Sequence, residues 1–444
     1  MRILMIGTGY VGLVTGACFA EIGHFVTCMD KDKGKIEKLN NDEIPIFEPG
    51  LEELVAWNKG TGKLRFIDNL DQLKTEVPDF VFLAVGTPSQ KSTGKADLSF
   101  VFAAAQEAAE KLSAMGGNGF TVFVTKSTVP VGTSIKVRQV IEKYLPPERF
   151  AVASNPEFLR EGAAIEDFMK PDRIVVGSDS EKARAMFEEM YRPLTRQGYP
   201  LVVTSTIATA ELTKYAANAF LATKITFINE LSRLCEKVDA RVDEVALGLG
   251  LDSRIGNRFL NPGPGFGGSC LPKDTLALIK TAIDFESPLE IVETVIAVND
   301  KHKHLMTEKI RQAVGGNVRD KRIGILGLAF KAHTDDVRYS PSLTIIADLQ
   351  KEGASVISYD PEGMEQARQT LPDAEYANNA EQVFDKADLV VLVTEWPQFT
   401  NLDWPGLYKK MNTPTLVDLR NILPHKKLRE TGFTCHSIGG FVGE

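Results

Sequence analysis

The 444-residue chain has few cysteines, no excess of basic residues and no long apolar run. Its five cysteines are scattered and odd in number, and no two of them form a CxxC pair. This pattern argues against a disulfide framework and against a structural metal site. We therefore expect no bound metal, and a reducing, cytoplasmic compartment.

The net charge of −8 provides no basic field that would attract a nucleic acid. No apolar run reaches the roughly 18 residues that a membrane span requires. The chain opens directly with an apolar strand pattern, which leaves no room for a secretory signal. We expect neither a nucleic-acid partner nor a membrane partner, and at this length we expect two or three globular domains.

The N-terminal stretch carries the pattern of a dinucleotide-binding unit. The apolar strand 2–6 runs into Gly7-Thr8-Gly9-Tyr10-Val11-Gly12, a helix is predicted for residues 13–23, and the next strand ends at Asp30, 18 residues after Gly12. This order of elements is typical of a site in which the pyrophosphate rests on the helix N-terminus. Asp30 would bind the ribose and favour NAD over NADP, a preference that Lys35 weakens slightly. The alternative is a doubly wound domain without a nucleotide.

Two further apolar strands, 80–85 and 120–124, are each followed by polar residues. The carboxyl ends of the strands in an open α/β sheet face the ligand. Thr87 and Thr128 are therefore candidate cofactor contacts, and turn capping is the alternative role for Thr87.

The segment that follows the short strand 151–153 contains two carboxylates, Glu157 and Glu161, with Arg160 between them. One interpretation is a solvated helix turn. The functional alternative places both carboxylates at the same sheet edge as Thr128, facing the cofactor.

Residues 206–238 contain neither proline nor glycine and carry apolar residues at helical spacing. A helix of about 30 residues would be about 45 Å long and would offer a surface for self-association. Lys214 and Asn218 lie on one face of this helix. Lys214 is either a solvated surface lysine or a fixed positive charge for a developing oxyanion.

The most unusual stretch is the glycine-rich loop 261–274, in which Cys270 stands at the start of a predicted helix. The helix dipole and the neighbouring Lys273 favour the thiolate, and Asp274 projects from the same helix face as Cys270. A buried small hydrophobe is the ordinary fate of a cysteine. Our hypothesis is instead a cysteine nucleophile that acts on a bound carbonyl or alcohol.

The last third repeats the opening strand and turn at residues 321–331, with altered glycines. Lys331 and Arg420 follow predicted strands and are expected to reach the phosphates or sugar of a second nucleotide. The fold predicted is α/β, with two Rossmann-like doubly wound sheets joined by a central helical domain. The predicted domains are 1–200 for NAD, 201–314 for dimerisation and the catalytic cysteine, and 315–444 for the sugar nucleotide.

Six groups of residues together resemble the UDP-glucose/GDP-mannose dehydrogenase family over nearly the whole chain. They are Gly7–Gly12 with Asp30, Ser127–Pro130, Asn155–Gly162, Lys214 with Asn218, Gly265–Asp274, and Gly327–Lys331 with Arg338. The resemblance implies oxidation of the primary alcohol of UDP-glucose to the carboxylate of UDP-glucuronate, with two NAD⁺ and a thiohemiacetal and thioester on Cys270. GDP-mannose is the alternative substrate, and the Gly-Pro-Gly-Phe-Gly-Gly spacing favours UDP-glucose.

The resemblance also implies a role for each matching residue. The residues implied in catalysis are Cys270, Asp274, Lys214, Asn218, Thr128 and Glu157, with the first proton passing to water held by Asp274 and Thr128. Those implied in NAD binding are Gly7, Gly9, Tyr10, Val11, Gly12, Asp30, Lys35, Thr87, Thr128, Glu161, Lys273 and Arg338. Those implied in substrate binding are Glu157, Phe158, Leu159, Arg160, Lys214, Asn218, Arg254, Phe259, Leu260, Asn261, Pro262, Gly263, Gly267, Phe330, Lys331 and Arg420. Arg254 would reach the substrate of a partner subunit, which implies a homodimer.

Two other classes of protein remain as alternatives. A sugar-nucleotide sensor would bind NAD structurally and would need no nucleophile, and a simple β-hydroxyacid dehydrogenase would perform one oxidation and need no thiol. The number of NADH formed per sugar separates these possibilities. The family reaction yields two NADH, a simple β-hydroxyacid dehydrogenase yields one, and a sensor yields none.

Overall fold

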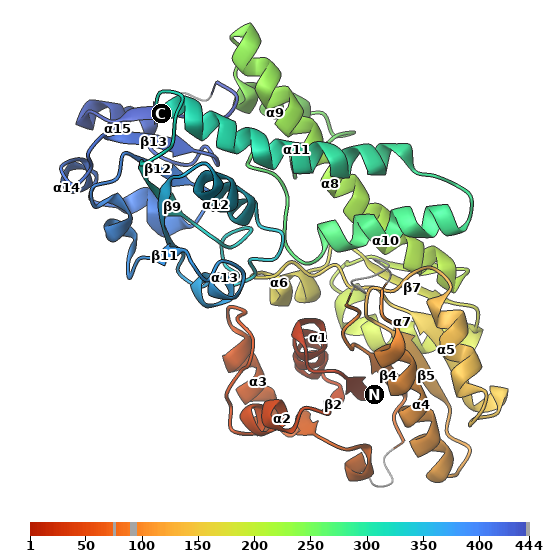
Figure 1. Cartoon of the computed structure of the whole chain (residues 1–444). Coiled ribbons are helices and arrows are strands. Elements are labelled where there is room, and N and C mark those ends of the chain that lie inside the picture. The colour runs from red at the N-terminus through yellow and green to blue at the C-terminus, as the bar shows by residue number, and fades with distance from the viewer. Residues whose placement is uncertain (74–76, 89–95, 441–444) are drawn as a thin grey trace. The chain divides into compact units, whose positions relative to one another are not determined.

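The computed structural model describes residues 1–73, 77–88 and 96–440 (Figure 1). The chain forms two compact units, Met1–Ala217 with Lys280–Phe285 and Asn218–Ile279 with Glu286–Glu444. Each unit contains one α/β sheet, which confirms the predicted pair of Rossmann-like sheets with a helical region between them in sequence. The predicted division into three domains stays a prediction.

The sheet of the first unit has the strand order β3-β2-β1-β4-β5-β6-β7-β8. All neighbours are parallel except β6 and β7, which are antiparallel. The sequence analysis predicted β1, β2, β4, β5 and β6 but not β3, β7 and β8. The strands are β1 (Arg2–Ile6), β2 (Phe25–Met29), β3 (Leu64–Ile67), β4 (Phe80–Leu83), β5 (Thr121–Thr125), β6 (Phe150–Ser154), β7 (Ile174–Ser178) and β8 (Leu201–Thr204).

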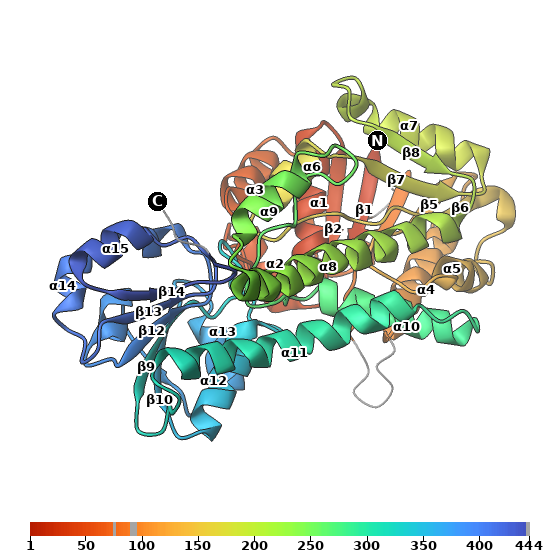
Figure 2. The same cartoon turned by 90° about the horizontal axis from the view of Figure 1, so that it is seen from above.

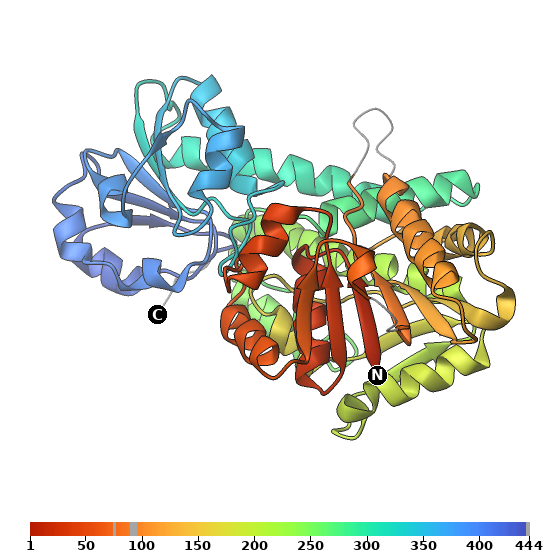
Figure 3. The same ribbon diagram turned by 90° about the horizontal axis from the view of Figure 1, so that it is seen from below.

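Helices cover both faces of this sheet, whose strands run side by side in Figure 3. Because side chains alternate along a strand, Ile3 and Met5 of β1 face one helical layer, whereas Leu4 and Ile6 face the other. The first layer comprises α1 (Tyr10–Glu21), α2 (Lys33–Asn40), α3 (Leu51–Gly60), α6 (Ala164–Met169) and α7 (Glu181–Thr195). The second comprises α4 (Ser99–Ala114) and α5 (Thr133–Ile141).

Helix α1 begins three residues earlier than predicted, at Tyr10 rather than at residue 13. Gly9 is its N-cap, and the backbone N–H of Leu13 donates to Gly9 O at 2.9 Å. The prediction took the whole glycine motif as a turn, but only Gly7 has the left-handed backbone of a turn, with φ +104°. The predicted end of α1 at Gly23 was also wrong, because the helix ends at Glu21 and Gly23, with φ +105°, lies beyond it.

Long helices follow the first sheet along the chain. Helix α8 (Ile207–Val238) has 32 residues and confirms the predicted long helix; it begins in the first unit and continues into the second. Helix α9 (Val242–Gly250) follows, and α10 (Leu271–Asp284) begins directly after Cys270, as predicted. Helix α11 (Glu290–Ala313) is long and uninterrupted, as Figure 2 shows.

The sheet of the second unit has the order β11-β10-β9-β12-β13-β14, and all its neighbours are parallel. This is the order of the first six strands of the other sheet. The strands are β9 (Arg322–Leu326), β10 (Ser355–Tyr359), β11 (Glu375–Tyr376), β12 (Leu389–Leu392), β13 (Thr415–Asp418) and β14 (Thr434–His436).

Two helical layers also cover this sheet (Figure 2). Ile323 and Ile325 of β9 pack against α11, α12 (Pro341–Lys351) and α13 (Met364–Thr370). Leu326 packs on the opposite side with α14 (Trp404–Tyr408) and α15 (His425–Thr431). In the part of the chain that the structure describes, no helix combines the length and the apolar character that crossing a bilayer requires.

Candidate functional site

The glycine loop between β1 and α1 has the shape that a dinucleotide needs. A Cβ atom on Gly12 would lie 2.0 Å from Gly7 O, so α1 can pack this close to the loop only with glycine there. A Cβ atom on Gly9, in contrast, would meet nothing within 4 Å. The loop therefore leaves open space beside the N-terminus of α1, where the backbone N–H groups of Tyr10 and Val11 suit a pyrophosphate.

Asp30 lies at the end of β2 and closes this loop. It accepts hydrogen bonds from the backbone N–H and the hydroxyl of Thr8, both at 2.8 Å, and from the N–H of Asp32 at 3.1 Å. Burial alone would raise the pKa of Asp30, but these hydrogen bonds and Lys35, 3.5 Å away, together lower it. Asp30 is thus held as a carboxylate with its side chain 18% exposed, which suits a ribose hydroxyl.

Thr87 and Thr128 lie together after the neighbouring parallel strands β4 and β5. The Thr87 hydroxyl donates to Thr128 O at 3.1 Å. Both residues therefore stand at the carboxyl edge of the first sheet, as the sequence predicted, and the Thr87 hydroxyl also ties one turn to the next.

Glu48, which the sequence analysis missed, fastens the segment 155–163 to the glycine loop. Its carboxylate accepts from the Tyr10 hydroxyl and from the backbone N–H groups of Gly162 and Ala164, the latter two at 2.7 Å. Burial and Glu48 both raise the pKa of Tyr10, so the phenol stays protonated. The predicted cofactor residue Tyr10 is therefore held by this clamp, and Glu161 lies in the clamped segment.

Glu157 and Lys214 form a buried ion pair in the first unit. Glu157 Oε1 lies 2.9 Å from Lys214 Nζ, and the two side chains are 5% and 4% exposed. Oε2 accepts from the Leu159 N–H at 2.6 Å. Burial alone would raise the pKa of Glu157, but Lys214, the Leu159 N–H and Lys126 lower it. The solvated interpretations of both residues are wrong.

Glu211, one turn before Lys214 on α8, anchors the helix in the first unit. Its carboxylate accepts from the N–H of Gly132 at 2.7 Å and of Ser134 at 2.9 Å, at the N-terminus of α5. The helix dipole and these hydrogen bonds favour the carboxylate, but burial outweighs them and raises the pKa of Glu211. This contact sets the position of Lys214 in the first unit.

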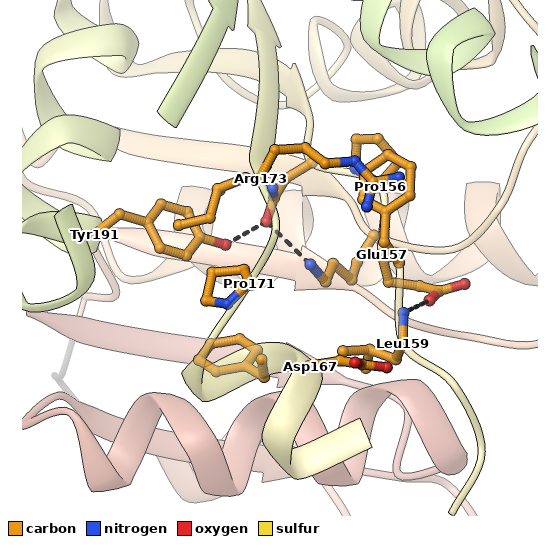
Figure 4. Close-up of a pocket in the computed structure, with 12 residues that line it drawn as sticks. Pro156, Glu157, Leu159, Asp167, Pro171, Arg173 and Tyr191 are labelled. Carbon is orange, nitrogen blue, oxygen red and sulfur yellow. Dashed lines mark hydrogen bonds between the residues drawn. The ribbon is translucent and has the colours of Figure 1, made fainter. Parts of the chain in front are cut away.

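A third charged group, Lys126, lies in the pocket drawn in Figure 4. Its Nζ donates to Asn155 Oδ1 at 3.2 Å, and the Tyr191 hydroxyl donates to the same oxygen at 2.6 Å. The sequence analysis gave no role to Lys126 or Tyr191, because a lysine after a strand is usually solvated; Asn155 appeared there only as the start of the segment Asn155–Gly162.

The predicted substrate residues of this segment lie around that pocket. The Arg173 guanidinium stacks on the Phe158 ring, 3.7 Å from its centroid. Arg160 forms a two-pronged pair with Asp167, at 2.6 Å for the shortest contact. Phe158 and Leu159 line the pocket itself.

In the second unit, Cys270 directly precedes α10 and is half-buried. The Asp274 N–H donates to Cys270 O at 2.9 Å, which makes Cys270 part of the first helical turn. Its Sγ lies 3.5 Å from Ser269 Oγ. All five cysteines lie in the described residues, and none of them forms a disulfide. This environment differs from those of Cys18 and Cys28, which are fully buried core residues.

Asp274 is the acid nearest in sequence to Cys270, and it is buried. Its Oδ2 accepts from Asn218 Nδ2 at 2.6 Å, and Lys273 Nζ lies 3.8 Å from Oδ1. The structure therefore brings three of the predicted residues of the second unit into one cluster, beside the backbone of Cys270.

Three buried polar side chains hold the loop 261–266, and the sequence analysis missed them. Asn229 of α8 accepts from the Gly263 N–H at 2.8 Å, and Asn299 of α11 accepts from the Phe266 N–H at 2.9 Å. His302 Nε2 contacts Gly263 O at 2.8 Å. Burial lowers the pKa of His302 to about 4. The sequence signal that could have identified these three residues is their position as polar residues on the apolar faces of α8 and α11.

The remaining predicted substrate residues of the second unit fall into two groups. Arg420 lies against Gly263 and donates to Phe330 O at 2.9 Å, while Lys331 stands beside the Phe330 ring. Arg254 is 87% exposed and pairs with Asp252 at 2.5 Å. Four more predicted substrate residues lie in the loop before Gly263: Phe259, Leu260, Asn261 and Pro262. The last one, Gly267, packs its Cα on Tyr339 O.

Arg338, predicted to contact the cofactor, forms a two-pronged pair with Asp336 at 2.8 Å. Asp336 in turn accepts from the Ser269 N–H at 3.2 Å, and the Gly268 N–H donates to Arg338 O at 2.7 Å. Arg338 is therefore tied to the loop that carries Cys270. The roles of all these residues stay predictions.

Comparison with known proteins gives matches along the whole chain. Residues 1–195 match the UDP-glucose/GDP-mannose dehydrogenase family, NAD binding domain; residues 208–301 match its central domain; and residues 324–425 match its UDP binding domain. A UDP-glucose 6-dehydrogenase of Rhizobium meliloti is 54% identical, with 99% of each chain covered. One of Bacillus subtilis is 44% identical, covering 99% of this chain and 93% of its own. The structure of a UDP-glucose dehydrogenase from Pyrobaculum islandicum has a TM-score of 0.89 at 36% identity and covers 100% of this chain and 98% of its own.

Proposed function

Because the chain belongs to the UDP-glucose/GDP-mannose dehydrogenase family, we propose that it oxidises UDP-glucose to UDP-glucuronate through a thiohemiacetal and a thioester on Cys270. The family's NAD binding domain makes the chain an NAD-dependent dehydrogenase. The single observation that carries the proposal is the half-buried Cys270 at the start of α10, with the buried Asp274–Asn218 pair one turn on. A thiol in this setting is suited to nucleophilic attack.

The first unit holds the cofactor in this proposal. Two NAD⁺, one for each oxidation, supply the hydride acceptor. The N-terminus of α1 and the open space over Gly9 receive the pyrophosphate, and Asp30 receives the ribose hydroxyls. Asp30, already ionised by its hydrogen bonds, repels a 2′-phosphate.

The first oxidation begins with loss of the alcohol proton at the sugar C6. We assign this proton to a water molecule activated by the Asp274 carboxylate, which Asn218 orients at 2.6 Å. Asn218 retains a second amide hydrogen that can stabilise an oxyanion. Loss of a hydride from C6 leaves the aldehyde.

The second oxidation uses the thiol. The Cys270 thiolate adds to the aldehyde, a C–S bond forms, and the carbonyl oxygen becomes the anionic oxygen of a thiohemiacetal. Lys214 and Asn218 stabilise this oxyanion. Loss of a second hydride leaves a thioester. Water activated by Glu157 then attacks, the C–S bond breaks, and the carboxylate leaves with the thiol restored.

The residues proposed to recognise the substrate come from separate parts of the sequence. Phe158, Leu159 and Arg160 contribute from the clamped segment of the first unit. In the second unit, Arg420 and Lys331 stand after strands β13 and β9 and offer positive charge to a diphosphate. The match of residues 324–425 to a UDP binding domain supports this assignment of the second sheet.

We also propose a homodimer. Phe220, Phe227 and Leu234 recur every seven residues on α8 and are exposed, as are Leu247 on α9 and Leu251 just after it. Exposed apolar residues on one helical face are typical of a subunit interface. Arg254 follows directly after this stretch of chain.

Counting NADH with purified protein tests the proposed function. UDP-glucose should yield two NADH and one UDP-glucuronate, and GDP-mannose should react at least tenfold more slowly at equal concentration. One NADH per sugar would indicate a simple alcohol dehydrogenase, and none would indicate a sensor. Faster turnover of GDP-mannose would move the assignment to the other branch of the family.

A further inference from the structure

Lys126 is a buried charged residue that the proposed mechanism does not use. It follows β5 directly, and its side chain is 5% exposed. Within the described residues, its Nζ bonds to the neutral amide of Asn155 at 3.2 Å and to no carboxylate. Burial of an ammonium group without a bonded carboxylate is costly, so its presence calls for a functional reason.

Asn155 is fixed so that its oxygen faces Lys126. The amide nitrogen donates to Val175 O at 2.8 Å, which sets the orientation of the side chain. The oxygen then accepts both from the Tyr191 hydroxyl, at 2.6 Å, and from Lys126 (Figure 4). The pocket is thus built to hold the ammonium group in one place, on strands β6 and β7 and helix α7.

Several charged groups face Lys126 from the surrounding elements of the first unit. Glu157 comes from the segment after β6 and Lys214 from α8, and these two are paired at 2.9 Å. Arg173 precedes β7, and Asp172 and Asp167 act on its guanidinium. Burial lowers the pKa of Lys126 to about 8, against the opposing effect of Glu157 and with a further lowering by Lys214.

The charge balance of this cluster decides what Lys214 can do. A buried one-to-one pair of Lys214 and Glu157 is neutral as a unit, so it offers little net attraction to a third, anionic group. When Lys126 is protonated, its charge also acts on Glu157 without a hydrogen bond between them, so Glu157 feels two ammonium groups, that of Lys214 at 2.9 Å and that of Lys126. The trio then carries one positive charge in surroundings of low dielectric.

We propose that Lys126 is a positioning residue, whose ammonium group shares the charge of Glu157 so that Lys214 retains a net positive charge toward the anionic intermediates. This inference rests on the proposed function, because it assigns Lys126 to the same reaction. Lys126 acts through Glu157 and Lys214 and does not itself touch the substrate.

The test is the pH dependence of kcat for Lys126→Met between pH 6.5 and 9.5, with UDP-glucose and saturating NAD⁺. Methionine keeps the length of the side chain without the charge. Below pH 8, where Lys126 of the wild type is protonated, the wild type should exceed the variant on the order of tenfold. Above pH 9 the wild-type lysine is itself neutral, and the ratio should fall to within about twofold. Lys143→Met, which removes an exposed lysine of the same unit, should show a constant ratio near one.

A double variant tests the route of the effect. Because Lys126 acts through Lys214, adding Lys126→Met to Lys214→Met should cost little beyond Lys214→Met alone. Independent losses that multiply would overturn the inference. So would a ratio of wild type to Lys126→Met that is flat or rises with pH.

Tyr191→Phe keeps the proposal testable if Lys126→Met does not fold. Removing the Tyr191 hydroxyl leaves the Asn155 oxygen to Lys126 alone, which favours the charged lysine and should move the inflection near pH 8 upward. An unmoved or lowered inflection would count against the proposal. The stoichiometry of the wild type is measured first: anything other than two NADH per UDP-glucose defeats the proposed function, whereas two NADH with a flat ratio defeats only the role of Lys126.

Discussion

In the first sheet the chain turns from β1 into α1 through Gly7 and Gly9, with Gly12 in the first turn of the helix, whereas in the second sheet it leaves β9 through a single glycine, Gly327. Both turns begin alike: Gly7 N–H donates to Met29 O and Gly327 N–H to Tyr359 O, each at 2.8 Å. They then diverge. Helix α1 begins at Tyr10, but in the second sheet α12 begins only at Pro341. The first turn exposes a helix N-terminus, and the second presents side chains such as Lys331.

The acid at the end of the second strand shows the same contrast. Asp30 binds the Thr8 N–H at 2.8 Å, and Asp360 binds the Leu328 N–H at 2.6 Å in the equivalent position. Asp30 remains 18% exposed, whereas Asp360 is fully buried. Asp360 also accepts from the Trp396 indole at 3.1 Å and from three more backbone N–H groups, those of Ala329, Glu362 and Gly363.

One strand order therefore serves two purposes. In the first sheet the glycine turn and its acid are open to a ligand, and in the second the acid holds the turn together internally. The charges that would meet a ligand in the second sheet come from Lys331 and Arg420 instead. This comparison makes opposite predictions for matched variants of the two sheets.

The largest effect should come from Asp360→Asn. An amide places N–H donors against the backbone donors that the carboxylate now accepts, within a fully buried network. The second unit should lose about 3–5 kcal/mol of stability, measured by denaturant unfolding. The matched Asp30→Asn should lose about 1 kcal/mol, because water reaches that site. Equal losses of stability in the two variants would contradict the conclusion that Asp360 holds its turn together whereas Asp30 is open to a ligand.

Acid should destabilise the second unit through His302. Its pKa is about 4 in the folded chain, against about 6.5 unfolded, so between these values only the unfolded state gains the proton. The stability is complete above pH 6.5 and falls as the pH drops towards 4, by about 2–3 kcal/mol at pH 4.5. Unfolding curves at several pH values measure this. His302→Gln should start less stable at pH 7 but lose less on acidification; an identical slope would contradict the assignment.

Asp30→Ala should act on cofactor binding more than on folding. Loss of the ribose partner should weaken NAD binding about tenfold to thirtyfold and narrow the discrimination against NADP, as titration by intrinsic fluorescence measures. Folding of the second unit should not change. An unaltered preference between the two cofactors would refute the ribose assignment.

The smallest effect should come from Lys331→Met. Removing one of several charges that face a diphosphate should raise KM for UDP-glucose about fivefold, with KM for NAD unchanged. The matched Lys35→Met should instead alter only the cofactor constants. A change in KM for NAD with Lys331→Met would mean that the two sheets do not divide the ligands as proposed.

Local patterns predicted much of this architecture. The strand, glycine turn and acid around Asp30, the long helix α8 and the helix after Cys270 each rest on a short-range signal, and each is confirmed. The strands β7 and β8 were missed although each contains a short run of apolar, mostly β-branched residues, IVV at 174–176 and LVV at 201–203. Strand β7 runs antiparallel to β6 within an otherwise parallel neighbourhood, so the alternation of strands and helices did not reveal it.

The partners of the predicted site residues were harder to see. Lys126, Glu48 and Asn229 are ordinary polar residues in sequence, and only tertiary packing makes them buried. Glu48 meets Gly162 across 114 positions of the chain, and no periodicity links them. A charged side chain is buried only where the fold brings a partner to it, and a single sequence does not show which residues become partners. The sequence alone therefore allowed a solvated position for Glu157 and for Lys214.

The measurement that tests the central claim most directly is mass spectrometry of the protein after rapid acid quenching during turnover with UDP-glucose and NAD⁺. Glu157→Gln should slow thioester hydrolysis, so a covalent sugar-nucleotide adduct should accumulate on the peptide that contains Cys270 and should be absent from Glu157→Gln/Cys270→Ala. An adduct on another residue, or UDP-glucuronate formed by Cys270→Ala at the wild-type rate, would contradict the account.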